Sequence, residues 1–309
     1  MMKTESMTIA VIGGGLSPEA EISRRSRAAV AAGLRRQGYT VTEVEATPDG
    51  LRAMLDARPE IAWIAAHGPL GEDGTLQGFL EMMRIPYTGT GVAASAVAMD
   101  KALTRRLLRG TSVRQPRWTT VGLGEVDWFS LPDDWSFPVI VKPVQGGSSV
   151  ATAVANSADE LIDAIYEVLR VDDRAIVETF LTGRELSVGV FEGEVLGDIE
   201  IETDRPFYDY SAKYESGHTR YILTPELADG VRGELHRQAL EVWQAVGCEG
   251  IVRIDFFLVG DQDLRFIEVN TTPGLTEHSL LPKMAAAAGL RFDELVERIA
   301  LQARLKCVI

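Results

Sequence analysis

The stretch IVRIDFFLVGDQDLRFIEVN, residues 251–270, decides the fold of the C-terminal part of the chain. Apolar residues alternate with polar ones on both sides of a Gly-Asp-Gln-Asp run, which predicts two antiparallel strands joined by a tight turn. With the turn centred on the middle of that run, Asp255 pairs with Glu268 and Arg253 pairs with Asn270. Alternation puts these four side chains on one face of the hairpin. The other face then carries Ile254, Phe256, Ile267 and Val269.

The two opposed carboxylates are the unusual feature of this hairpin. Directly paired residues have Cβ atoms about 4.5–5.5 Å apart, a distance at which like charges repel. A cation between Asp255 and Glu268 removes the repulsion, and hard oxygen ligands suit Mg²⁺, which completes its shell with water and nucleotide phosphates. The alternative is a solvated sheet face with scattered charges. The pattern predicts metal–phosphate chemistry without naming a substrate.

Composition bounds the class of protein. The 309 residues are enough for two or three domains, and the formal charge of −14 disfavours a sequence-independent nucleic-acid binder, which needs Lys/Arg patches. No apolar run approaches the length of a membrane span, and the N-terminus lacks a signal-peptide pattern. Two cysteines, Cys248 and Cys307, give neither a disulfide framework nor metal spacing. We expect a cytoplasmic protein that binds no membrane.

The N-terminal part alternates strands and helices. Strands are expected at 8–12, at 40–46 and from 61, with a helix that begins at Ser17-Pro18 and runs to about residue 37. This alternation predicts a parallel sheet, in which ligands bind at the carboxyl ends of the strands. Glu19 and His67 both follow such ends, although each residue alone also fits an ordinary helix-start or turn role.

The middle of the chain contains a candidate phosphate loop. A strand ends at Lys142 and is followed by QGGSS, where small residues leave backbone N–H groups free to bind oxygens. A lysine that ends a buried strand needs an anionic partner, and Lys101 could face the same anion. The chain has no P-loop, and its first glycine cluster lacks the dinucleotide-binding spacing. An ordinary turn is the alternative for the loop by itself.

Further elements follow from capping and period. Ser157 and Glu160 predict a capping box before a helix, and strands are expected within 174–183 and 185–202. Residues 203–225 form a long, aromatic, charged stretch of the kind that serves as a lid or binding loop. Helices are expected at 232–246 and over 283–306.

Seven stretches, in this order, resemble the D-alanine–D-alanine ligases of the ATP-grasp superfamily. They are GGLSPEAEIS (14–23), HGPLGEDGTLQG (67–78), PYTGTGVAASAVAMDK (86–101), VIVKP with GGSSV (139–150), FYDYSAKY (207–214), RIDFFL (253–258) and EVNTTPGLTEHSLLP (268–282). The resemblance implies an ATP-grasp fold of the α/β class, α+β in its ATP-binding part, behind a Rossmann-like parallel-sheet domain. The implied limits are 1–98 for that domain, 99–185 for the central subdomain, and 186–309 for the C-terminal subdomain with a lid at 203–225.

The resemblance also implies an ATP site with Mg²⁺. Two ions, replaceable by Mn²⁺, would be held by Asp255, Glu268 and Asn270. The nucleotide would be bound by Lys101, Lys142, Gly147, Ser148, Ser149, Glu178, Phe180, Leu181, Glu185, Lys213, Phe257 and Ile267. The lid would bring Lys213 to the γ-phosphate and close over the site.

The implied reaction joins two D-alanines through an acyl phosphate, at the expense of ATP, for peptidoglycan precursor synthesis. Catalytic roles fall on Glu19, Ser148, Lys213, Tyr214, Arg253 and Gly274, with substrate contacts from Glu19, His67, Tyr208, Arg253, Gly274, Ser279 and Leu280. Arg253 and the Gly274 N–H would stabilise the oxyanion. The expected partners are D-alanine and ATP, and the family suggests a homodimer.

Two rival readings remain. The first is a related ligase with another second substrate, such as D-serine, D-lactate or a different amine; the intact SAKY at 211–214 favours an amine. The second is a nucleotide-binding relative that senses ligands without catalysis, which the retained lysines, carboxylates and arginine disfavour.

Overall fold

A parallel sheet forms the N-terminal part of the computed structural model, which describes residues 7–147, 151–203, 219–276 and 279–307. Its strands pair in parallel, as the strand–helix alternation predicts, and their order is β2-β1-β3. Ile9 and Val11 face α1 and α10, whereas Ala10 and Ile12 face the cluster that contains α2 and α3. The elements are β1 (Thr8–Gly13), α1 (Ala20–Arg36), β2 (Thr40–Glu45), α2 (Pro48–Ala57), β3 (Ile61–Ile64) and α3 (Thr75–Met82).

The first helix begins later than its sequence predicts. α1 starts at Ala20, with Glu19 rather than Ser17 at the N-cap position. The Ser17 hydroxyl donates to the backbone oxygen of His67 (2.9 Å) and accepts from the Glu19 N–H (3.3 Å). The hydroxyl therefore joins the first loop to the loop after β3 instead of capping a helix.

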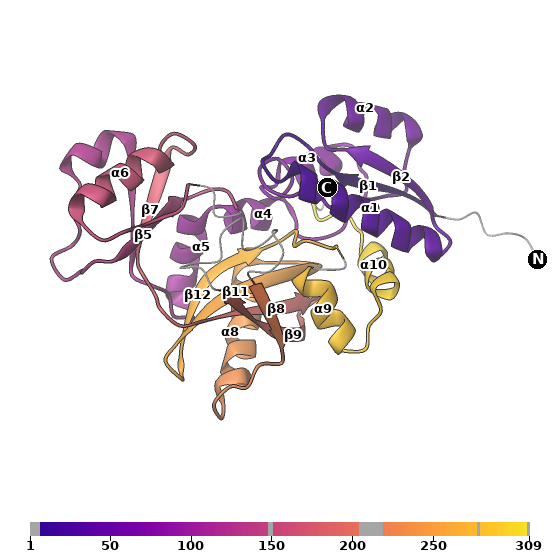
Figure 1. The fold of residues 1–309 in the computed structure, drawn as a ribbon. Helices are drawn as coiled ribbons and strands as arrows, with labels where there is room; N and C mark the ends of the chain where they lie inside the picture. The colour runs from indigo at the N-terminus through magenta and orange to yellow at the C-terminus, as the bar shows by residue number, and fades with distance from the viewer. Residues whose placement is uncertain (1–6, 148–150, 204–218, 277–278, 308–309) are drawn as a thin grey trace, which may run out of the picture.

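A four-stranded antiparallel sheet, β4-β7-β5-β6, stands with α6 at one end of the molecule (Figure 1). The Ser157 hydroxyl caps α6 by accepting from the Glu160 N–H, but the Glu160 carboxylate bonds Asn156, so the predicted capping box does not close. The elements here are β4 (Trp118–Gly122), η2 (Leu123–Trp128), β5 (Val139–Pro143), β6 (Ala153–Ala155), α6 (Ala158–Val168) and β7 (Arg174–Thr179).

A five-stranded antiparallel sheet, β10-β9-β8-β11-β12, lies between the other two in Figure 1. One face packs against α8, and the opposite face of β9 packs against α9. Helices α4 and α5 also contact this part, through β12 and α8. The elements are β8 (Arg184–Phe191), β9 (Glu194–Thr203), β10 (Thr219–Leu223), α8 (Val231–Val246), β11 (Ile251–Val259) and β12 (Asp263–Asn270), with α4 (Val92–Met99), α5 (Lys101–Leu107) and η1 (Leu108–Gly110) beside them.

The C-terminal helical region, expected over 283–306, begins at Leu280 and consists of two helices. α9 (Leu280–Ala287) and α10 (Phe292–Leu301) are separated at Gly289, whose φ of +83° is a left-handed conformation that glycine adopts without strain. α10 returns to the N-terminal part, where the Arg36 guanidinium pairs with Asp293 at 2.6 Å. No helix in the described ranges has the length and apolar character that a membrane crossing requires. The domain limits at 98/99 and 185/186 stay predictions.

The hairpin of β11 and β12 has the predicted register at its functional end. Asp255 pairs with Glu268 and Arg253 pairs with Asn270. A bulge follows, so that Phe256 pairs with Phe266 and the turn is centred one half-step earlier than expected. Because the bulge inserts Ile267, that side chain leaves the core face, and its predicted place beside Phe256 is wrong.

Candidate functional site

An inner cavity of about 380 Å³ gathers residues from all three parts of the chain. Glu19 comes from the start of α1, His67 follows β3, Arg253 lies on β11, and Gly274 lies in the loop after β12. Nine predicted residues line it: Glu19, His67, Gly147, Arg253, Glu268, Asn270, Gly274, Ser279 and Leu280. Predicted positions up to 261 residues apart in sequence, Glu19 and Leu280, therefore line one cavity.

His67 is buried and connects two loops of this cavity. Its Nδ1 lies 2.8 Å from the backbone oxygen of Thr272, and its Nε2 lies 3.0 Å from the Ser26 hydroxyl. Burial alone lowers the pKa of His67, but the hydrogen bond and charge of Glu72 outweigh it and raise the pKa above its ordinary value. His67 thus orients the loop that carries Gly274. Glu72 is a cavity residue that the sequence reasoning missed, although it lies within the GEDG motif.

Two glycines of the cavity lie close to neighbouring side chains. A Cβ at Gly274 would lie 3.0 Å from the Ser279 Oγ, and a Cβ at Gly147 would lie 3.3 Å from Glu19 Oε1. The Ser279 hydroxyl accepts from the Thr276 N–H at 3.1 Å and precedes α9. The Ser279 N–H donates to the Thr276 backbone oxygen at 3.0 Å, whereas the Leu280 N–H opens α9 and has no intrahelical partner. The Ser279 hydroxyl and the Leu280 N–H are therefore the donors suited to a carboxylate.

A second cavity of about 370 Å³, here called the hinge cavity, lies between the four-stranded and five-stranded sheets. Phe257 and Ile267 come from one sheet, and Phe180 and Leu181 follow β7 of the other. The bulge in β12 is what turns Ile267 toward this cavity. Apolar walls at this spacing suit a planar ring system. Glu185 does not line the cavity; it lies on β8 opposite Phe257.

The hinge cavity is also lined by the charged side chains of Arg105, Lys142 and Glu178, with Lys101 nearby. Lys142 Nζ lies 2.9 Å from Glu178 Oε2, and Arg105 Nη2 lies 2.7 Å from Glu178 Oε1. Lys101 donates to the Gly146 carbonyl at 2.7 Å and lies 4.0 Å from Glu268. Burial lowers the pKa of Lys101, and Glu268 opposes that change. The sequence reasoning missed Arg105, because nothing in its spacing distinguishes it from a solvated helix arginine.

The predicted metal ligands have suitable donor chemistry. Asp255 and Glu268 oppose each other on neighbouring strands, and the Asn270 Oδ1 is held toward the loop by the Thr272 N–H at 3.0 Å. Among the residues that the structure describes, no group of three His, Cys, Asp or Glu side chains could hold a metal, so an ion here would need the amide and phosphate oxygens. Arg253 now bonds both Asp255 oxygens, and Ser187 donates to one of them.

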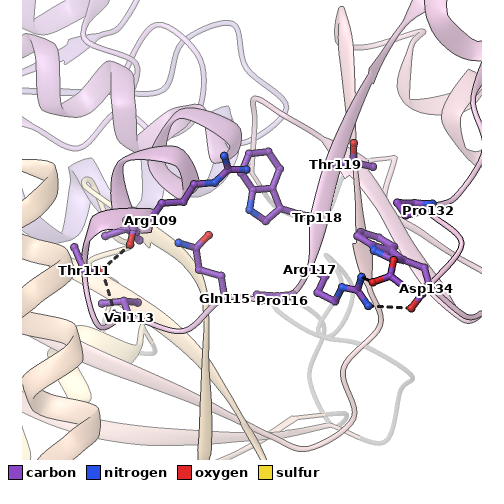
Figure 2. A pocket seen from close by; sticks show the side chains of 12 residues that line it. Arg109, Thr111, Val113, Gln115, Pro116, Arg117, Trp118, Thr119, Pro132 and Asp134 are labelled. Carbon is purple, nitrogen blue, oxygen red and sulfur yellow. Dashed lines mark hydrogen bonds and ion pairs between the residues drawn. The ribbon is translucent and has the colours of Figure 1, made fainter.

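A third hollow, of about 580 Å³, holds none of the predicted residues. Figure 2 shows its surroundings: the Arg109 guanidinium stacks over Trp118, 5.1 Å from the ring centroid, and Arg117 pairs with Asp134. Pro116 lines both this hollow and the hinge cavity. The segment before β4 is therefore a thin wall between them.

Five predicted site residues lie outside the described residues, so their placement stays a prediction. They are Ser148, Ser149, Tyr208, Lys213 and Tyr214, and most of the predicted 203–225 lid lies outside with them.

Comparison with known proteins gives one consistent family. The model described as "D-ala D-ala ligase C-terminus" matches residues 123–301, and "D-ala D-ala ligase N-terminus" matches residues 49–90. A relative from Syntrophotalea carbinolica, named D-alanine–D-alanine ligase, is 43% identical over 298 residues, which covers 96% of each chain.

Solved structures agree with the sequence comparison. The D-alanine–D-alanine ligase of Bacillus anthracis complexed with ATP is 31% identical, with a TM-score of 0.84 over 96% of this chain and 97% of that one. The VanG D-Ala:D-Ser ligase of Enterococcus faecalis is 26% identical, with a TM-score of 0.82 over 96% of this chain and 98% of that one. The fold is that of the ATP-grasp ligases, as predicted.

Proposed function

The chain belongs to the D-alanine–D-alanine ligase family, and we propose that it uses ATP to join two D-alanines into D-alanyl-D-alanine. The observation that carries this proposal is the inner cavity, where an acid, an arginine, a glycine amide and a helix N-terminus converge beside the carboxylate pair of β11 and β12. Such a set fits two amino acids and a phosphate. The product is a peptidoglycan precursor.

Activation of the first D-alanine is assigned to the N-terminal side of the cavity. Glu19 holds the ammonium group of this D-alanine by charge. The carboxylate of the same D-alanine attacks the γ-phosphate of ATP to give an acyl phosphate and ADP. Lys101 and Lys142 neutralise the nucleotide phosphates, while the hinge cavity holds the base between Phe257, Ile267 and the residues after β7. Lys213, with Ser148 and Tyr214, completes this step by closing the lid.

Peptide-bond formation is assigned to the C-terminal side. Ser279 and the Leu280 amide hold the carboxylate of the second D-alanine, which places its amine against the acyl phosphate. Arg253 and the Gly274 N–H stabilise the charge that develops on the carbonyl oxygen, and phosphate leaves. The glycine allows this approach because a side chain there would meet Ser279.

Magnesium is proposed at Asp255, Glu268 and Asn270, with two ions and with Mn²⁺ as a substitute. When bound, the metal neutralises phosphate charge. Asp255, which now accepts from Arg253, would hold the metal with Glu268 and Asn270, and the Arg253 guanidinium would stabilise the reacting carbonyl. We further propose a cytoplasmic homodimer, on the strength of family resemblance.

The test is product formation by the purified protein. With ATP, MgCl₂ and D-alanine we expect ADP and D-alanyl-D-alanine in equal amounts, identified by coupled assay and mass spectrometry, and none with L-alanine. Absence of phosphate release above background with D-alanine would exclude this function. A mixed dipeptide or ester that forms faster with D-serine or D-lactate would replace it with the corresponding ligase.

A further inference from the structure

Arg105 is a fully buried charged side chain that takes no part in the reaction steps proposed above. It lies on α5 with 0% of its surface exposed, in the wall of the hinge cavity. Arginine is almost never fully buried unless it is paired. The fold therefore keeps this residue at a considerable cost in desolvation, which calls for a reason beyond packing.

One nitrogen of Arg105 joins both sheets. Nη2 lies 2.7 Å from the Glu178 carboxylate on β7 and donates to the Ile267 carbonyl on β12 at 3.2 Å. Its Nε and Nη1 are buried and find no hydrogen-bond partner among the described residues. Only Nη2 of this guanidinium makes contacts, and leaving the other buried nitrogens without partners costs free energy. The two Nη2 contacts are therefore the reason to look for in this position.

Both contacts involve residues that line the hinge cavity. Glu178 also pairs with Lys142, so its carboxylate lies between a phosphate-binding lysine and the apolar walls. Ile267 is the bulged residue, and a bulge leaves the ladder locally disrupted. By binding its carbonyl, Arg105 fixes the bulge that turns the Ile267 side chain into the hinge cavity and sets the position of the neighbouring Glu268.

Hydrogen bonds through Gln115 connect Arg105 to β12 a second time. Gln115 donates to the Arg105 backbone oxygen at 3.1 Å, and Arg265 of β12 donates to the Gln115 oxygen at 3.0 Å. Figure 2 shows Gln115 next to Pro116, the residue that lines both the hinge cavity and the third hollow. α5, the connecting segment and β12 are thus linked into one support.

We propose that Arg105 is a positioning residue for the purine ring of the nucleotide, acting through Glu178 and through the bulge at Ile267. The inference rests on the proposed function, since it assumes that the hinge cavity holds the base. A fixed carboxylate accepts a hydrogen bond from the 6-amino group of adenine and repels the 6-oxygen of guanine. Arg105 therefore sets nucleotide preference as well as affinity.

The experiment uses Arg105→Lys and Arg105→Met in the full chain, with Arg106→Met on the exposed side of the same helix as the control. KM for ATP, KM for D-alanine, the ATP-to-GTP ratio of kcat/KM and direct ADP binding by calorimetry are measured for each. We expect Arg105→Lys to raise the KM for ATP about tenfold and to lower the ATP preference, with the KM for D-alanine within about twofold of wild type. Arg105→Met should show a larger change in the same direction, and Arg106→Met should match wild type.

Each outcome decides something. A folded Arg105→Lys protein with unchanged ATP affinity and unchanged ATP-to-GTP ratio would overturn the proposal, even if its melting temperature falls, because packing alone explains a loss of stability. Should Arg105→Met fail to fold, Arg105→Lys decides alone. If wild type binds ADP but makes no dipeptide, the proposed function fails, whereas the ADP-binding comparison still tests Arg105.

Discussion

The hinge cavity and the inner cavity hold their polar groups in different ways. In the hinge cavity, buried side chains bind one another: Glu178 pairs with both Lys142 and Arg105. In the inner cavity, His67 and Ser279 bind the backbone of nearby loops, and Arg253 pairs with Asp255 beside them. One arrangement balances charges before any ligand arrives, and the other fixes the shape of loops.

This difference predicts how each cavity responds to substitution. Removing one member of a buried ion pair leaves an uncompensated charge, which lowers both folding stability and nucleotide binding. Removing an uncharged side chain that holds a loop, such as Ser279, changes the fit of the amino acids but leaves no unpaired buried charge. The two cavities should therefore separate in mutants, with Glu268 between them as the residue that affects both.

Glu268→Gln should give the largest effect, a loss of about a thousandfold in kcat/KM, comparable to the removal of a group that stabilises transition-state charge. Glu268 pairs with Asp255 and lies 4.0 Å from Lys101, so the substitution removes charge where metal and phosphates meet. Activity is measured across a MgCl₂ series, with the exposed Glu194→Gln as control. Wild-type activity in Glu268→Gln at low MgCl₂ would remove the metal assignment.

Glu178→Gln should give the second-largest effect, and it should lower folding stability and ATP affinity together. Lys142 and Arg105 both lose their counter-charge, so we expect the free energy of unfolding to fall by about 3 kcal/mol and the KM for ATP to rise at least tenfold. Urea denaturation and steady-state kinetics measure the two quantities. The exposed Glu167→Gln, which pairs with Arg170, is the control. An ATP effect without any loss of stability would break the distinction between the cavities.

Ser279→Ala should affect the amino acid alone. It removes one hydrogen bond to the charged carboxylate, worth roughly tenfold or more in the KM for the second D-alanine, while ADP binding stays at the wild-type value. The hydroxyl also accepts from the Thr276 N–H, so a small loss of melting temperature is expected. Calorimetric titration with ADP provides the contrast. A change in ADP affinity equal to the change in KM would show that the cavities are not separable.

His67→Gln should give the smallest effect and a defined pH dependence. The folded-state pKa of His67 is raised above its ordinary value, so the stability that its protonation contributes is fully present below about pH 6.5 and is lost as the pH rises through the folded pKa. Glu72 and Glu19 are the charges that face it. The difference in free energy of unfolding between wild type and His67→Gln, on the order of 1 kcal/mol and measured by urea denaturation, should be larger at pH 6 than at pH 9. An opposite trend contradicts the assignment.

Alternation and motif order predicted the functional end of the hairpin but not its bulge. The pairing of Asp255 with Glu268 follows from counting outward from the turn, and the parallel N-terminal sheet follows from strand–helix alternation. Counting fails at Ile267, because the turn is shifted by half a step and one inserted residue restores the register. The alternation of apolar and polar residues does not show that a shifted turn and a bulge offset each other.

Long-range partners account for the other differences. Ser17 has the sequence of a helix cap, but its hydroxyl is taken by the His67 carbonyl fifty residues away. Arg105 has the sequence of a solvated arginine, but the approach of β7 and β12 buries it against Glu178. Neither partner can be found from local pattern, since both arise only when separate elements pack.

The central claim is that nucleotide and amino acids occupy the two cavities, with the carboxylates of β11 and β12 between them. A crystal structure with ADP, Mg²⁺ and D-alanine tests this directly. The account predicts the adenine between Phe257 and Ile267, an ion shared by Asp255 and Glu268, and D-alanine beside Glu19 or Ser279. Adenine bound elsewhere, with those two carboxylates sharing no ion, would contradict it.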